Sequence, residues 1–221
     1  MEKSIENIWK EGFLQKDALV APTVIDLYNR KSIHIIDKFK RMFKINLIAI
    51  VVFAVLFLIV SFFMGIQFMG IPFFIILSML VFINKRLMDE LKYIDKGDSS
   101  YQYLKAFNYW IKRQVKINER LSRFLYPAFF LSFIAGFWFK DEQGLFLGER
   151  LVNKLLNSYP EMYLVQGVPL VGIIAVVVIM IMLTLLGGII YKWDLNIVYG
   201  RVFRKLEEIM SDMEELKKTN T

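Results

Sequence analysis

The feature that most constrains this chain is a run of forty residues, from Ile45 to Asn84, that contains no charged side chain. A helix needs about 20 apolar residues to cross the roughly 30 Å hydrocarbon core of a bilayer. The run is therefore too long for one span and long enough for two. Two glycines and a proline between residues 64 and 72 supply a turn in its middle. We predict a helical hairpin in lipid, with spans at 45–64 and 70–84.

Two further stretches have the same character. Residues 124–139 are uncharged and mostly apolar, and the long stems of the flanking arginines can extend this short span toward the headgroups. Residues 168–191 form a second uncharged, largely apolar run. The composition agrees, because 56% of the residues are hydrophobic, against about 45–50% in soluble proteins. We predict an all-α fold, a polytopic membrane four-helix bundle whose helices extend into the cytoplasm.

Positive charge is unevenly distributed among the segments that flank these spans. Lysine and arginine number nine in residues 1–44, ten in 85–123 and six in 192–221, but only three in 140–167. Loops that are rich in lysine and arginine stay on the cytoplasmic side of a membrane. The distribution predicts a multi-pass membrane protein with both termini and the central loop in the cytoplasm. Contact with anionic lipid explains the basic excess better than nucleic acid does, so no nucleic-acid partner is expected.

The segments outside the spans show helical patterns. Residues 1–22 form a cytoplasmic leader, and an amphipathic helix that begins at 23 runs into the first span. Residues 85–123 are a predicted cytoplasmic helical hairpin with a turn near 95–100. Residues 140–167 are an outer loop whose short amphipathic helix lies on the outer leaflet or caps the bundle. Pro127 predicts a kink or break at the start of the third span.

The tail, residues 192–221, has the most regular pattern. Its apolar residues alternate at spacings of four and three, which is a heptad seam typical of a coiled coil: Leu195, Tyr199, Val202, Leu206, Ile209, Met213 and Leu216. The predicted packing partner is either the protein's own cytoplasmic helices or a second copy of the chain. A homodimer is therefore one of the open alternatives.

Small residues recur every four positions on the third span, at Ala128, Ser132 and Gly136. Small side chains at this spacing let helix backbones approach closely. We predict helix packing at these three residues, within one chain or between two. The same role is predicted for the tail residues Val202, Leu206, Ile209 and Met213.

The residues that catalysis or metal binding would require are scarce. No ionisable side chain lies inside any of the four spans, and this argues against a proton- or sodium-coupled transporter. The chain has no cysteine and a single histidine, His34, which is a poor basis for a metal site. No nucleotide-binding or nucleophile motif is present. We expect a non-enzymatic protein without a metal or cofactor.

The leader carries Ile5, Ile8, Trp9 and Phe13, and a tryptophan outside any span favours contact with another surface. We predict that these four residues bind a protein partner; the alternative is that Trp9 packs on the cytoplasmic side of the bundle or enters the lipid headgroups. The leader (Ile5-Glu6-Asn7-Ile8-Trp9-Lys10) and the lysine-rich helix over 31–41 resemble a loose class of small bacterial inner-membrane proteins. Such proteins are encoded beside alternative sigma factors and are presumed anti-sigma regulators. This chain lacks the zinc motif and the sizeable outer domain of better-known anti-sigma factors.

The patterns and the resemblance together predict a regulatory or adaptor protein that acts through its cytoplasmic helices. Two alternatives stay open at this point. One is a small transporter or channel subunit, which would need a polar cavity among the spans. The other is a structural protein that shapes the membrane through its short spans and its outer amphipathic helix.

Overall fold

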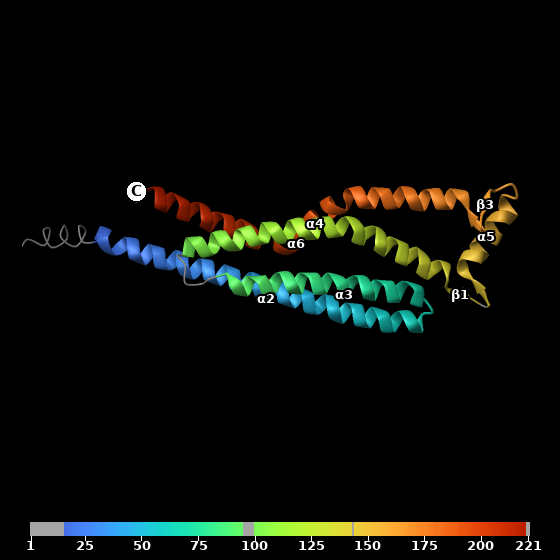
Figure 1. Ribbon diagram of the computed structural model, residues 1–221, viewed down its shortest axis with the longest axis horizontal. Helices are drawn as coiled ribbons and strands as arrows, with labels where there is room; N and C mark the ends of the chain where they lie inside the picture. The colour runs from blue at the N-terminus through green and yellow to red at the C-terminus, as the bar shows by residue number, and fades with distance from the viewer. Residues whose placement is uncertain (1–15, 95–99, 143, 220–221) are drawn as a thin grey trace, which may run out of the picture.

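The computed structural model describes residues 16–94, 100–142 and 144–219, with side chains described for 30–94, 101–141 and 144–215. The predicted partner-binding residues of the leader lie outside this range. The described chain is mostly helical: α2 (Lys16–Phe63), α3 (Gln67–Glu90), the short 3-10 helix η1 (Leu91–Tyr93), α4 (Ser100–Trp138), α5 (Leu147–Ser158) and α6 (Leu170–Thr219). Figure 1 shows these elements, and the predicted all-α fold is confirmed.

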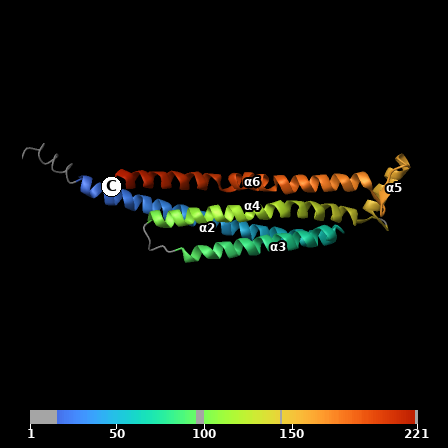
Figure 2. The same cartoon turned by 45° about the horizontal axis from the view of Figure 1, so that its top comes forward.

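Four long helices run along the long axis of an elongated molecule (Figures 1 and 2). Each of them contains a stretch that is long and apolar enough to cross a membrane, within 30–63, 67–93, 101–138 and 170–215. The first residues of α2 and the last of α6 lie at one end of the molecule, and α5 crosses the other end (Figure 1). The chain is therefore a multi-pass membrane protein with four candidate spans.

A tight turn joins α2 to α3 at the far end of the hairpin. Gly65 adopts φ +68°, a conformation that glycine reaches without steric cost. The backbone N–H of Ile66 donates to the carbonyl oxygen of Ser61 at 2.9 Å. A side chain at Gly70 would overlap Ser61, so the two helices approach closely here. Helix α3 begins at Gln67, three residues before the predicted start of the second span.

The structure refines two of the expectations, one for α2 and one for α4. Helix α2 already includes Lys16, the first residue that the structure describes, so residues 16–22 of the predicted leader are helical. One proline, Pro22, removes a single helical hydrogen bond, and the alanines and leucine around it favour a helix. Helix α4 continues without a break through Pro127, but it changes direction partway along, in its yellow-green part (Figure 1), so the structure excludes the break and is consistent with the predicted kink. A proline inside a membrane helix is tolerated where local adjustment satisfies the freed carbonyl.

Two short hairpins flank α5 and connect it to the long helices. Strand β1 (Asp141–Glu142) pairs with β2 (Leu145–Phe146), and β3 (Leu164–Val165) pairs with β4 (Val168–Pro169), both antiparallel. Gly144 and Gly167 have positive φ angles in the two turns. A Cβ on Gly148 of α5 would overlap the ring of Trp138, so α5 packs directly on the end of α4.

The main hydrophobic core lies near the end of the molecule that carries both termini. We call this part the terminal bundle. It consists of residues 30–47 of α2, residues 84–94 (the end of α3 with η1 and Ile94), residues 101–118 of α4 and residues 195–213 of α6. Phe39 lies at its centre, with ring centroids 5.5 Å from Phe107, 6.1 Å from Trp110 and 5.2 Å from Tyr199. Because these aromatic side chains come from α2, α4 and α6, one cluster joins three helices.

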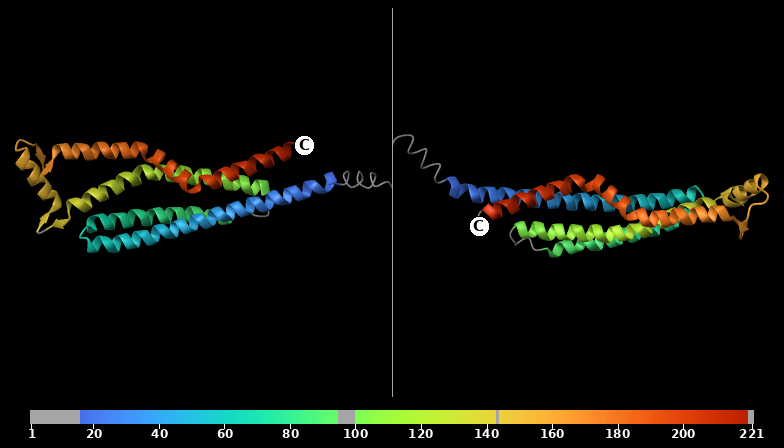
Figure 3. Two further views of the ribbon diagram at one scale, coloured as in Figure 1. Left: turned by 180° about the vertical axis from the view of Figure 1, so that it is seen from behind. Right: turned by 90° about the horizontal axis from the view of Figure 1, so that it is seen from above.

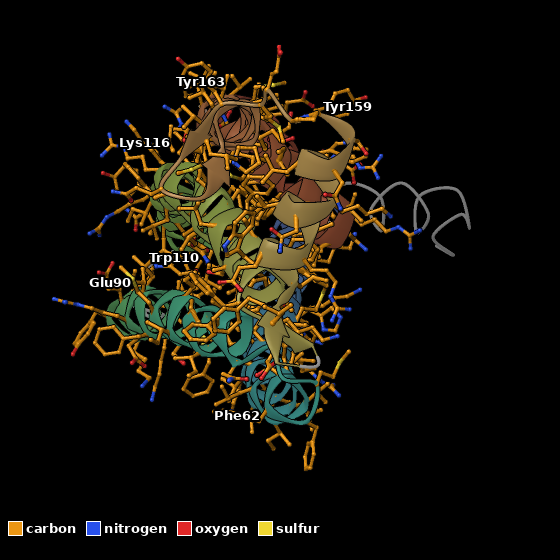
Figure 4. The ribbon with its side chains drawn as sticks, turned by 90° about the vertical axis from the view of Figure 1, so that its right-hand side faces the viewer. Phe62, Glu90, Trp110, Lys116, Tyr159 and Tyr163 are labelled. Atoms are coloured by element: carbon orange, nitrogen blue, oxygen red, sulfur yellow. The ribbon has the colours of Figure 1, made fainter. Side chains whose placement is uncertain are left out.

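The remaining, apolar half of the molecule buries little of its own surface. Within the candidate spans, only 11–22% of the most apolar stretch is buried. Large side chains face outward, among them Phe62 (58% exposed; Figure 4), Phe82 (68%) and Leu185 (70%). In this half, α6 stands apart from the α2–α3 hairpin (Figures 1 and 3). Such a surface is stable when lipid, rather than water, surrounds it.

Helix α6 bends sharply where it passes from the apolar half to the terminal bundle, in the orange-red stretch around 180–200 (Figures 1 and 3). Gly187 and Gly188 belong to this stretch, and glycines are a common cause of helix bends. A Cβ on Gly187 would come within 3.0 Å of the backbone of Arg123 on α4. The Ser122 hydroxyl donates to the carbonyl oxygen of Gly187 at 3.0 Å. The glycine pair therefore permits a close α4–α6 crossing at the bend.

Candidate functional site

The predicted packing residues of the third span lie on the inner side of α4. Gly136 is buried against Met69 of α3, and a Cβ at Gly136 would overlap that methionine. Ser132 is also buried, and its hydroxyl donates to the carbonyl oxygen of Ala128 at 2.7 Å. The close approach at Gly136 is therefore made between two helices of one chain.

The heptad residues of the tail lie in the terminal bundle. Val202, Leu206 and Ile209 are buried in the same core as Phe39 and Phe107, and Met213 packs against it. Helix α6 makes these contacts with α4 and α2 of its own chain. Of the two packing partners left open by the sequence, the protein's own helices occupy this face.

A buried amide layer closes the terminal bundle toward the apolar half. Asn84 of α3 and Asn118 of α4 exchange two hydrogen bonds, each 3.0 Å between amide nitrogen and oxygen. The amide nitrogen of Gln114 lies 3.5 Å from the same oxygen of Asn84. All three side chains are buried. A satisfied network of this kind fixes how two helices are aligned, because sliding either helix would leave buried amides unpaired.

This layer was not predicted from the sequence, although the sequence contains a signal for it. The apolar stripe of α4 continues from Phe107 and Ile111 to Gln114 and Asn118 at spacings of four, three and four. Two amides at successive core positions of an amphipathic helix predict a buried polar contact with another helix. The partner could not be read in the same way, because Asn84 stands at the end of a long uncharged run.

A small cavity of about 200 Å³ lies beside the amide layer, where all four long helices meet. The polar side chains that line it come from all four: Asn46, Asn84, Asn118, Tyr191, Asp194 and Tyr199. The Asn46 amide donates to the Tyr199 hydroxyl at 3.3 Å. Burial raises the pKa of Tyr199, although the hydrogen bond from Asn46 acts in the opposite direction. The phenol therefore stays neutral at physiological pH, and it serves as a hydrogen-bonding group.

Charged pairs lie on the outside of the bundle, near the amide layer and the cavity beside it. Lys192 Nζ lies 3.0 Å from Glu119 Oε2, and Arg123 lies 3.4 Å from the other carboxylate oxygen. The hydrogen bond from Lys192 is the main cause that lowers the pKa of Glu119. Exposed pairs of this kind add little stability. Two of these contacts join α4 to α6: the Lys192–Glu119 pair, and the hydrogen bond that the Tyr126 hydroxyl donates to Asp194 at 3.0 Å.

A groove of about 550 Å³ lies on the terminal bundle between α3 and α4. Its floor includes Trp110, whose indole N–H donates to the carbonyl oxygen of Leu87 at 2.9 Å; Figure 4 shows this residue between the two helices. The rim carries Tyr109, which is 73% exposed, and the ion pair of Arg113 with Glu90 at 2.9 Å. An exposed aromatic side chain beside a charged pair is suited to protein contact.

Metal binding finds less support in the described residues than contact with a protein. Within the described ranges, no three histidine, cysteine, aspartate or glutamate side chains gather where they could hold a metal ion.

Comparison of the chain with protein-family models, with curated proteins and with solved structures gives no match. No family model fits the chain, and no curated protein and no solved structure is detectably similar to it.

Proposed function

We propose that this membrane protein is a non-enzymatic regulator or adaptor that acts through its terminal bundle on the cytoplasmic side of a bacterial inner membrane. The observation that carries the proposal is the position of the core. The aromatic cluster around Phe39 and the amide layer lie in the terminal bundle, whereas the spans leave most of their surface to lipid. A rigid, folded part outside the membrane is what a docking platform requires, and a transporter would instead concentrate polar groups at the depth of its spans.

The distribution of charge supports the cytoplasmic placement. The segments that carry both ends of the described chain hold most of the 28 lysine and arginine residues. The segment 140–167, which surrounds α5 at the opposite end, holds three. By the positive-inside tendency, the terminal bundle belongs in the cytoplasm.

The α3–α4 groove is the surface that we assign to a protein partner. Tyr109 offers an exposed aromatic ring, and Arg113 and Glu90 offer charges of both signs at the rim. The leader residues Trp9 and Phe13 are a second predicted contact. The resemblance to proteins encoded beside alternative sigma factors makes a transcription factor of that class the first partner to test.

The test is site-specific photo-crosslinking in intact cells. A benzophenone side chain would replace Tyr109 or, as the matched control, Tyr163, which is equally aromatic, 81% exposed and placed near α5 at the other end (Figure 4). We expect one cytoplasmic protein to be captured from position 109 and not from 163. A chain that lacks residues 1–20 should capture less of it and should change the transcripts that this partner controls. Capture of lipid alone at both positions, with unchanged transcripts, would contradict the proposal.

A further inference from the structure

A second groove, of about 730 Å³, lies on the terminal bundle between α2 and α3, which run side by side (Figures 1 and 2). Helix α2 contributes Lys40, Arg41 and Lys44 to its walls. The other wall contains Lys92 and Asp89, and the apolar side chains of Met88, Leu91 and Ile94 also line the groove. The groove therefore combines an apolar base with a strongly basic rim.

The positive charge of this groove is only partly neutralised by protein groups. Among the described residues that line the groove, Asp89 is the one carboxylate, and Lys92 Nζ lies 2.8 Å from it. Lys40 turns toward α4, where its ammonium donates to the Tyr103 hydroxyl at 3.3 Å. Arg41 and Lys44 are exposed, and neither forms an ion pair or hydrogen bond with any residue that the structure describes. Two cations that face the same groove are thus available to an anionic ligand.

The groove lies at the depth of the lipid headgroups. Lys44 immediately precedes Ile45, the first residue of the uncharged run. At about 1.5 Å of rise per residue, Arg41 lies about 6 Å beyond the end of that run. The headgroup layer on each side of the hydrocarbon core is about 5–8 Å thick. The cations on α2 are therefore placed at the level where the phosphates of a bilayer lie.

The apolar side chains that continue the groove toward the bilayer are exposed. Ile45 and Ile48 follow Arg41 and Lys44 by four residues and so share their face of α2. On α3, Phe82 stands two turns before Asp89 and is also exposed. A ligand with a phosphate head and hydrocarbon tails meets matching surfaces at both ends. A soluble phosphate or an acidic peptide would leave the apolar surface unused.

We propose that the α2–α3 groove is a binding site for an anionic phospholipid of the membrane leaflet on the side of the terminal bundle. The Arg41 guanidinium and the Lys44 ammonium hold the phosphate, since a guanidinium can bind it through two parallel hydrogen bonds. The acyl chains run along α2 and α3 into the apolar half. This inference is independent of the proposed regulatory role, and it concerns a different face of the terminal bundle.

The test is lipid binding to the full chain in a neutral detergent, measured by native mass spectrometry. The probes are phosphatidylglycerol, phosphatidylcholine and inorganic phosphate. Each basic residue near an anionic lipid contributes about a fivefold change in affinity. We therefore expect the double variant R41Q/K44Q to bind phosphatidylglycerol about 30-fold more weakly, with phosphatidylcholine bound weakly by both proteins.

Two further variants separate a site from diffuse charge. K112Q/K116Q removes the same charge from exposed positions on α4 and should bind within about twofold of the natural protein. D89N removes the carboxylate of the groove and should tighten binding by about fivefold, so one test depends on a gain and not on a loss. Equal weakening by both double variants would overturn the proposal, as would a failure of D89N to strengthen binding. Displacement of the lipid by millimolar inorganic phosphate would show a soluble-anion site instead.

Discussion

The amide layer between α3 and α4 allows a stability prediction that depends on pairing. Substitution of Asn84 by leucine, which has a similar shape, removes the donor to the Asn118 oxygen and leaves that oxygen buried without its partner. The cost of an unsatisfied buried acceptor is about 1–3 kcal/mol. N118L leaves the Asn84 oxygen with only the 3.5 Å contact to Gln114, so its cost should be of the same size.

The double variant N84L/N118L removes both amides together, and the two leucines can pack against each other. Its destabilisation should be smaller than the sum of the two single costs by about 1–3 kcal/mol. The measurement is the free energy of unfolding in mixed micelles, followed by circular dichroism over a denaturant series. Single effects that simply add, to within about 0.5 kcal/mol, would show that the two amides do not act as a pair.

Three further outcomes follow from the structure. G136A should lower the free energy of unfolding by about 1–3 kcal/mol through overpacking, whereas the control G172A, with its nearest contact at 3.9 Å, should be nearly neutral in the same measurement. In a chain without natural cysteines, an impermeant thiol reagent on intact cells should label S158C but not S211C; the reverse pattern would invert the proposed topology. Because burial raises the pKa of Tyr199 in the folded state, its stabilising contribution is complete below about pH 10 and falls as the pH rises further. Y199F should therefore lose less stability than the natural protein between pH 9 and pH 11.

The spans could be predicted from the sequence because a bilayer imposes a length and excludes charge, and both are visible along a chain. The uncharged run from Ile45 to Asn84 is an example: its middle glycine, Gly65, does make the turn. The continuity of α4 through Pro127 could not be predicted, because a proline breaks or bends a helix according to neighbours that only the fold supplies.

The sites on the terminal bundle were less accessible to sequence reasoning. The amide layer depends on which helix faces Asn118, and periodicity describes one helix at a time. The α2–α3 groove depends on Lys44 and Lys92 lining the same surface, although they are 48 positions apart in the sequence. Charge counts had already indicated contact with anionic lipid, but a count does not say where cations gather around a concave surface.

The bend in α6 at Gly187 divides a 50-residue helix into two arms of unequal length. The arm inside the terminal bundle extends about 45 Å from the bend. Around such a pivot, a tilt of about 5° in the membrane would move the tip of that arm by about 4 Å, which approaches the roughly 5.4 Å pitch of one helical turn. Because that arm is packed against α2 and α4 in the core, such a movement would have to carry the terminal bundle with it.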